Sequence, residues 1–261
     1  MNRKIISVIN QKGGVGKTTT VINLAAGLTM KGKKILVIDL DPQGNATTGL
    51  GLSNTTSSDQ TIYNVLNGNK KISEVIQSTS FESLDLISSN VDLSGLEVET
   101  AGDSRRAFKL KDELTLILNN SGLSYDYIII DCPPSLGVLM TSALAAADEL
   151  LIPLQCEFFG LEGLAKIVHV QEQIKLSGAN PKGIIEGIVM TMYDGRTNLC
   201  KQVVEQVRQY FPDQVYETVI RRSIRLGEAP SYGKTIVEYD KSSHGAADYI
   251  SLADEFLERR A

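Results

Sequence analysis

The sequence predicts an α/β fold in one domain spanning residues 1–261, with a doubly wound, mostly parallel sheet and helices on both faces. Apolar runs of strand length alternate along the chain with amphipathic runs of helix length. Several strand runs, such as Lys34–Asp39 and Tyr127–Asp131, are almost continuously apolar, as expected when both faces of a parallel strand are buried. No stretch marks a seam between two cores, because the loosely composed segment Gly49–Gln60 is too short for an interdomain linker. We interpret that segment as a surface loop.

The elements are assigned from the spacing of their apolar residues, which has period two or is continuous in strands and has a period near 3.6 in helices. In chain order they are strand Lys4–Asn10, helix Thr18–Met30, strand Lys34–Asp39, strand Leu84–Ser88, helix Arg105–Asn119, strand Tyr127–Asp131, helix Leu136–Ala147, strand Glu149–Pro153, helix Leu161–Leu176, strand Ile184–Met192, helix Leu199–Phe211 and a final helix near Ala246–Arg259. Ligands of such sheets bind at the carboxyl ends of the strands, so the residues just after each strand are the candidates for chemistry.

Composition indicates a soluble globular protein, with 42% hydrophobic and 22% charged residues. No apolar run approaches the roughly 20 residues that cross a bilayer, and the first residues lead directly into a strand rather than a signal peptide. We therefore expect a cytoplasmic protein. Its cysteines, Cys132, Cys156 and Cys200, are widely spaced without a Cys-x-x-Cys pair, which favours reduced structural thiols over zinc ligands or disulfides.

Charge is distributed unevenly along the chain. The whole protein has a net charge of −5, yet Arg196–Lys234 holds seven basic and four acidic residues, so this segment is +3 and the remainder −8. This asymmetry indicates one basic face.

A glycine-rich loop follows the first strand and opens the first helix. Gly13, Gly14 and Gly16 let successive backbone N–H groups point inward, and the helix N-terminus adds partial positive charge, which together make a phosphate cradle. The run matches Gly-x-x-x-x-Gly-Lys-Ser/Thr except at its first position, Gln11. Lys17 would then reach the β and γ phosphates, and the Thr18 hydroxyl would ligate Mg²⁺. The predicted nucleotide-binding residues are Lys12, Gly13, Gly14, Val15, Gly16, Lys17, Thr18 and Thr19. A glycine-rich turn with an incidental lysine is the alternative.

Carboxylates follow two of the predicted strands. Asp39 and Asp41 come at the end of one, and Asp131 ends another. Because Mg²⁺ prefers oxygen ligands and keeps several waters, all three acids are candidates for its site together with Thr18. The alternative is that these acids only cap the turns that follow them.

These segments carry a resemblance to a known family. "KGGVGKTT", "DLDPQGNATTGLG" and "DYIIIDCPPSLG" resemble the deviant Walker A ATPases of the ParA/MinD group, a branch of the P-loop NTPases. The later stretches "PLQCEFFGLEGL", "TMYDGRTNL" and "IRLGEAPSYGK" extend the similarity along nearly the whole chain, toward the short chromosomal partition ATPases called ParA or Soj. The resemblance implies hydrolysis of ATP with Mg²⁺. Adenine rather than guanine is expected because no Asn-Lys-x-Asp element appears, and "TMYD" at 191–194 stands in its place.

The resemblance also implies roles for residues in the loop. In this family the lysine that matches Lys12 reaches across a dimer interface to the phosphates of the other subunit's nucleotide, as an arginine finger does. ATP binding would therefore produce a homodimer, and Gly13 would stay small so that two subunits can approach closely. Asp41 matches the acid that orients the attacking water. Asp39 and Asp131 match acids near the Mg²⁺ and its water shell, so the predicted metal residues are Thr18, Asp39 and Asp131. The catalytic residues implied are Lys12, Lys17 and Asp41.

Arginines in the basic segment are candidates for contact with DNA phosphates. A solvated charged face is the usual meaning of scattered arginines, but in this family arginines in the regions matching "DGRTN" and "VIRRSIRLGEAP" bind duplex DNA without sequence preference, and only in the dimer. The predicted residues are Arg196, Arg222 and Arg225. The resemblance further implies a nucleoid-associated protein whose hydrolysis is stimulated by a ParB-like centromere-binding partner, for segregation of a chromosome or plasmid.

Two alternative functions were weighed. A MinD-like regulator of cell division or positioning would end in a basic amphipathic helix that binds membrane, whereas the tail here holds Asp248, Asp254, Glu255 and Glu258 against Arg259 and Arg260, so no membrane partner is expected. A redox protein like the nitrogenase iron protein would share a cluster between subunits. Cys132 and Cys156 follow strands suitably, but their spacing and flanking residues do not match that family's ligands.

Overall fold

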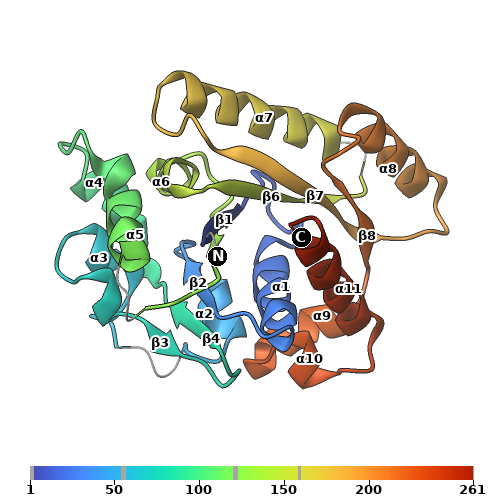
Figure 1. Cartoon of the computed structure of the whole chain (residues 1–261), viewed down its shortest axis with the longest axis horizontal. Helices are drawn as coiled ribbons and strands as arrows, with labels where there is room; N and C mark the ends of the chain where they lie inside the picture. The colour runs from blue at the N-terminus through green and yellow to red at the C-terminus, as the bar shows by residue number, and fades with distance from the viewer. Residues whose placement is uncertain (1–2, 54–56, 120–122, 158–159, 261) are drawn as a thin grey trace.

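One mixed sheet forms the centre of the molecule (Figure 1). The computed structural model describes residues 3–53, 57–119, 123–157 and 160–260. Within these residues the sheet has eight strands, in the spatial order β3 (Gln77–Ser78), β4 (Leu84–Ile87), β2 (Ile35–Asp39), β5 (Tyr127–Asp131), β1 (Lys4–Val8), β6 (Glu149–Gln155), β7 (Ile184–Tyr193) and β8 (Val215–Arg221). Neighbouring strands are parallel except for β3 and β4. The predicted doubly wound, mostly parallel α/β fold is confirmed.

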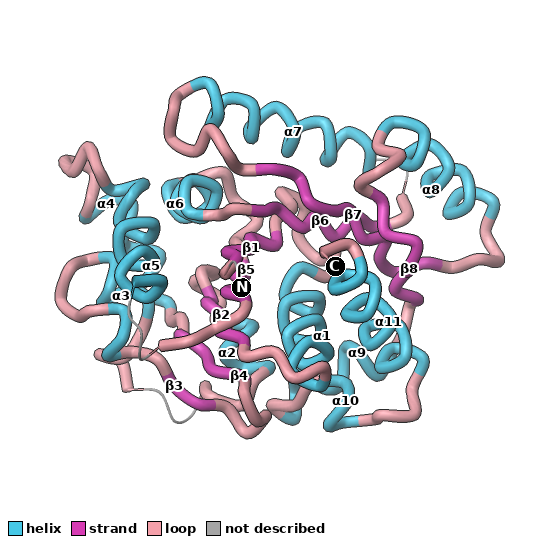
Figure 2. The backbone as a smooth tube through the Cα atoms, viewed as in Figure 1, coloured by secondary structure: helices cyan, strands magenta, loops and turns pink. Residues whose placement is uncertain are grey.

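Helices cover both faces of this sheet (Figure 2). One face carries α3 (Ile62–Leu66), α4 (Leu96–Glu99), α5 (Lys109–Asn119), α6 (Val138–Ala146), α7 (Gly160–Leu176) and α8 (Asn198–Tyr210). The other carries α1 (Lys17–Met30), α2 (Asn45–Gly49), α9 (Ile224–Glu228), α10 (Ile236–Tyr239) and α11 (His244–Glu258). Short 3₁₀ turns lie at Ile72–Glu74, Val91–Gly95, Arg106–Phe108 and Ala229–Tyr232.

Each strand contributes side chains to two separate cores. In β5, Ile128 and Ile130 belong to the core under α5 and α6, whereas Ile129 belongs to the core under α1 and α11. The continuous apolar run of this strand is explained by burial on both sides. The three cysteines are free and buried in the first core, as structural thiols would be.

Two strands were missing from the sequence prediction. β8 forms one edge of the sheet, and its sequence "VYETVIR" mixes buried and exposed positions, so it lacks the continuous apolar signal of the central strands. β3 has two residues and no periodicity to detect. The short helices α2, α3, α4, α9 and α10 were also not predicted. Of the predicted loop at residues 49–60, residues 54–56 lie outside the described residues.

The acidic C-terminal helix α11 packs on the protein core. It lies beside α1 in Figure 1, and its residues Tyr249, Leu252 and Phe256 are buried. The approach is close, because a Cβ built on Gly27 of α1 would lie 2.8 Å from the Cβ of Ala253. Among the helices that the structure describes, none is both long and apolar enough to pass through a bilayer.

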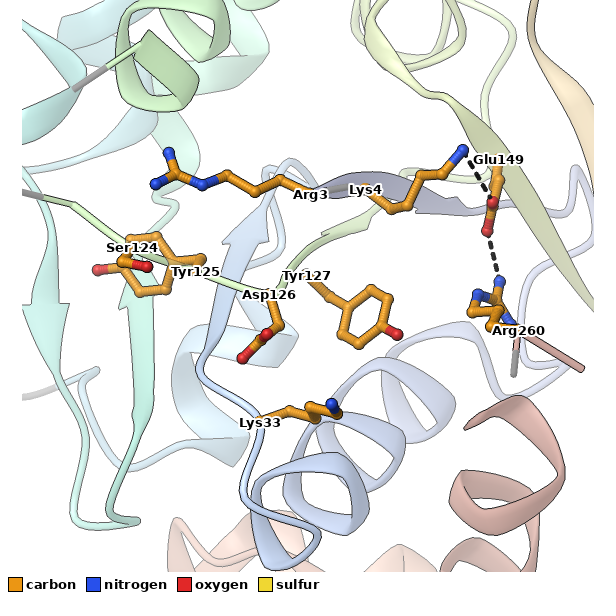
Figure 3. A pocket seen from close by; sticks show the side chains of 9 residues that line it. All are labelled: Arg3, Lys4, Lys33, Ser124, Tyr125, Asp126, Tyr127, Glu149 and Arg260. Atoms are coloured by element: carbon orange, nitrogen blue, oxygen red, sulfur yellow. Dashed lines mark hydrogen bonds and ion pairs between the residues drawn. The ribbon is translucent and has the colours of Figure 1, made fainter. Parts of the chain in front are cut away.

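An ion-pair cluster anchors the end of this helix at the amino edge of the sheet (Figure 3). Arg260 pairs with Glu149 at the start of β6 and with Glu186 of β7, the latter at 3.1 Å. Lys4 Nζ lies 3.4 Å from the same Glu149, whose side chain is only 8% exposed. The cluster borders a cavity of about 640 Å³ and lies at the sheet edge opposite the strand ends that carry the candidate site.

We predict that Arg260→Ala lowers the free energy of unfolding by about 3 kcal/mol, because it leaves two buried carboxylates short of a partner. Urea denaturation measures this loss. Arg105→Ala removes an exposed ion pair with Asp112 and serves as the control, with a much smaller expected change because water screens such a pair. A loss for Arg260→Ala no larger than the control's would show that the cluster does not stabilise the fold.

Candidate nucleotide-binding site

The glycine loop connects β1 to α1 at the carboxyl edge of the sheet and is held by neighbours on two sides. The buried Asn10 donates from Nδ2 to the Pro153 carbonyl at 2.8 Å and accepts from the Lys12 amide at 2.9 Å. Thr191 of β7 donates to the Val15 carbonyl at 2.8 Å. Gly14 and Gly16 have φ of 76° and 89°, in the left-handed region that glycine adopts without strain. The loop is therefore preshaped, with the side chains of Asn10, two residues after β1, and of Thr191 in β7 fixing its course.

The two lysines of the loop have different surroundings. Lys17, the first residue of α1, is only 7% exposed, and its Nζ donates to the Lys12 carbonyl at 3.2 Å. Burial lowers the pKa of Lys17, while the nearby Asp131 carboxylate opposes the shift. The Lys12 side chain, in contrast, is 41% exposed and forms an ion pair with Glu157. Only Lys17 thus faces the buried side of the loop.

The predicted carboxylates come together at the ends of β2 and β5. Asp39 and Asp131 are direct neighbours in the strand register, and both are fully buried. Thr18 Oγ1 donates to Asp131 Oδ2 at 2.7 Å, whereas Asp131 Oδ1 is buried without a hydrogen-bond partner among the described residues. Burial and the neighbouring Asp39 raise the pKa of Asp131.

Both carboxylate oxygens of Asp39 accept hydrogen bonds. Its Oδ2 accepts from the amide and hydroxyl of Thr47 at 2.8 and 2.7 Å, and its Oδ1 accepts from the Asp41 amide at 3.2 Å. Burial raises its pKa to about 6 in spite of these donors. Asp41 itself is 8% exposed and accepts from the Gln43 amide at 3.0 Å. Asp39 therefore fixes the turn that presents Asp41 and the start of α2.

The residues present fit a magnesium ion. No three His, Cys, Asp or Glu side chains in the described part of the chain are grouped as a protein-only metal cage. Mg²⁺ usually takes one or two protein oxygens and completes its shell with phosphates and waters. Thr18 and the unpartnered oxygen of Asp131 match that requirement, whereas the oxygens of Asp39 are already engaged.

A cavity of about 540 Å³ opens beside the loop. One side is lined by the loop itself with Asp41, and the other by Met192, Leu226, Gly227 and Pro230. Sequence reasoning did not identify this second side. Met192 of β7 has φ of 51°, unusual for a residue with a side chain. It lies where the β7–β8 register is irregular, directly after Thr191, which holds the loop. Met192, Leu226 and Pro230 add apolar surface to the lining, which is suited to the flat base of a nucleotide.

The predicted DNA-contacting arginines follow two adjacent strands, and one of them, Arg225, lies in the short helix α9. Arg196 follows β7 and Arg222 follows β8, at the same sheet edge as the glycine loop. Arg196 pairs with Asp194 at 2.7 Å, and Arg225 pairs with Glu228 at 2.9 Å. Arg222 has an exposed side chain that makes no ion pair with any residue in the described ranges, and it lines a cavity of about 200 Å³ together with Gly16 and Thr19.

A parallel sheet, a glycine loop opening a helix, and a buried lysine beside carboxylates at the strand ends define a P-loop nucleotide-binding protein. Comparison with known proteins is consistent with this class. A family model described as an AAA domain matches residues 3–183. The chromosome partitioning protein ParA of Myxococcus xanthus is 47% identical over 256 residues, which cover 98% of this chain and 88% of the relative.

A second relative, the chromosome-partitioning ATPase Soj of Treponema pallidum, is 46% identical over 256 residues, with 98% of each chain covered. Among solved structures, cobyrinic acid a,c-diamide synthase from Mycobacterium smegmatis with a bound ATP analogue and magnesium superposes with a TM-score of 0.83 at 32% identity, over 99% of this chain and 96% of that one. The chain belongs to the ParA/Soj family of chromosome-partitioning ATPases. The resemblance drawn from the sequence motifs is thereby confirmed.

We predict that the Asp39 carboxyl of the nucleotide-free protein titrates with a midpoint near pH 6. Because this pKa lies above that of an unfolded aspartate, the folded chain holds a proton that the unfolded chain has lost between about pH 4 and pH 6. This group's contribution to the free energy of unfolding therefore declines as pH rises through that interval. Carbon-13 NMR of labelled aspartate carboxyls measures the midpoint, with Asp39→Asn to assign the signal. A midpoint near pH 4 would contradict the prediction.

Proposed function

We propose that this protein is an ATP-dependent partition ATPase whose residues 1–261 act as one domain. The observation that carries the proposal is the composite site itself, in which a preshaped glycine loop, the buried Lys17 and the Thr18–Asp131 pair meet at one edge of the sheet. Strands from Lys4 to Arg221 join a single sheet, and α11 packs back on α1, which supports one unit rather than two. The substrate is ATP with Mg²⁺, as bound in analogue form by the Mycobacterium smegmatis relative.

Phosphoryl transfer requires mainly positioning and charge stabilisation. The loop amides and Lys17 bind the β and γ phosphates, and bound Mg²⁺ would supply further positive charge, held through Thr18 and Asp131. Asp41 orients the attacking water, and Asp39 holds Asp41 in place through its hydrogen bond to the Asp41 amide. The remaining predicted nucleotide contacts, from Lys12 to Thr19, come from the loop and the first turn of α1.

The exposed position of Lys12 supports the proposal that ATP binding brings two subunits together. The Lys12 side chain lies on the exposed side of the loop, where a second subunit can approach, and so supplies a cation in trans to the partner's phosphates. Gly13 supports this arrangement, because a Cβ built there meets nothing within 4 Å in the free subunit. A requirement for glycine at this position therefore comes from the partner subunit.

The dimer binds duplex DNA without sequence preference through Arg196, Arg222 and Arg225. Two of these arginines are neutralised by Asp194 and Glu228 in the free subunit, so one subunit alone offers few phosphate contacts. Pairing doubles the number of contacts, which makes affinity depend steeply on dimerisation and on salt. A ParB-like centromere-binding protein then stimulates hydrolysis and release, and the protein is cytoplasmic and nucleoid-associated.

We predict that duplex DNA is retained with ATP and Mg²⁺ but not with ADP or without nucleotide, and that Asp41→Ala prolongs the ATP-dependent retention. Arg222→Ala removes one phosphate contact per subunit, which is expected to weaken DNA binding roughly ten-fold and to reduce the salt slope by about 2 for the dimer. Filter binding across a salt series measures both effects.

Arg105→Ala, which removes an exposed arginine far along the chain from these loops, is the matched control. Equal retention in every nucleotide state would overturn the proposed cycle. An Arg222→Ala variant that behaves like the control would place the DNA surface elsewhere.

A further inference from the structure

Both lysines of the glycine loop have partners within the free subunit. Lys17 Nζ donates to the Lys12 carbonyl at 3.2 Å, and the Lys12 ammonium forms an ion pair with Glu157. Each cation proposed to bind phosphate is therefore engaged by the protein itself. Lys12 is held through its backbone as well as its side chain, because its amide donates to Asn10 Oδ1 at 2.9 Å.

Glu157 is oriented for this contact by the end of β6. Gln155, the last residue of β6, donates from its side-chain amide to Glu157 Oε1, which leaves Oε2 for Lys12. Two residues before Gln155, the Pro153 carbonyl accepts from Asn10, so the end of β6 and the start of the loop are tied together. The carboxylate thus stands at a fixed place opposite the Lys12 side chain.

We propose that Glu157 is a positioning residue that retains Lys12 within its own subunit until ATP is bound and a second subunit arrives. The inference rests on the proposed function, in which Lys12 acts in trans. In the proposed dimer the Lys12 ammonium leaves Glu157 for the phosphates of the neighbouring subunit, so dimerisation exchanges one anionic partner for another. Glu157 therefore sets how much ATP the protein needs before it dimerises.

Binding of ATP in the same subunit weakens the anchoring of the Lys12 backbone. When Lys17 turns to a phosphate it leaves the Lys12 carbonyl, and the backbone of Lys12 loses one of its two anchors in the loop. A triphosphate carries several charges, whereas Glu157 offers one, and that carboxylate is 42% exposed to competing water. The exchange of partners therefore favours the trans phosphate once the neighbouring subunit presents ATP, and ATP in the same subunit makes the exchange easier.

The test measures dimerisation by sedimentation velocity across a series of concentrations of a non-hydrolysable ATP analogue with Mg²⁺. Glu157→Gln keeps the shape of the side chain and removes its charge. We expect it to lower the half-maximal analogue concentration roughly two- to five-fold, the range that loss of an exposed ion pair covers. Glu217→Gln is the control, because it removes another exposed carboxylate, paired with Arg208, near the start of β8 and so toward the opposite edge of the sheet.

A double-mutant cycle shows whether Glu157 acts through Lys12. In a Lys12→Gln background, Glu157→Gln is expected to change nothing. An unchanged or raised half-maximal concentration for Glu157→Gln alone would overturn the proposal, as would an equal effect in both backgrounds. If Lys12→Gln by itself dimerises like the wild type, the trans role of Lys12 fails, and that result is separate from any result obtained with Glu157.

Discussion

Buried charge at the carboxyl edge of the sheet is the constraint on which the site depends. Lys17, Asp39 and Asp131 are each nine-tenths or more buried, and burial disfavours the charged form of all three. A buried charged group lowers the stability of the fold unless opposite charges compensate it. In the proposed cycle a triphosphate and Mg²⁺ supply charges that compensate these buried groups when they bind.

The parallel sheet makes this arrangement possible because all its central strands end at the same edge. β1 leads into the glycine loop, β2 and β5 deliver the carboxylates, and β7 supplies Thr191, which holds the loop. The segments after β7 and β8 carry the predicted arginines, and Arg222 among them lines a cavity together with Gly16 and Thr19 of the loop and first helix. The amino edge, in contrast, holds the ion pairs of Arg260 that fasten the C-terminal helix. The ion pairs that hold the C-terminal helix and the residues of the candidate site thus lie at opposite edges of the sheet.

Much of the fold was predictable from the sequence because burial on both sides of a strand leaves a continuous apolar run. Tyr127–Asp131 was predicted with the bounds that the structure has. The edge strand Val215–Arg221 was not, since partial exposure leaves a mixed sequence with no period. In the site, Lys17, Thr18 and Asp131 were found by motif, and the structure brings them together. Met192 and Glu157 were missed, because neither an unusual backbone angle nor an ion pair between residues far apart in the sequence leaves a local sequence pattern.

The central claim, that Lys12 serves the nucleotide of the other subunit, is tested most directly by mixing two inactive variants. The Lys12→Gln chain keeps Lys17 for its own nucleotide. The Lys17→Ala chain keeps Lys12, which can reach the nucleotide of its partner. A mixed dimer then contains one complete site assembled from both chains. The account predicts that ATP hydrolysis, negligible for either variant alone with DNA present, returns when the two are mixed. A mixture as inactive as its components would contradict a lysine that acts in trans.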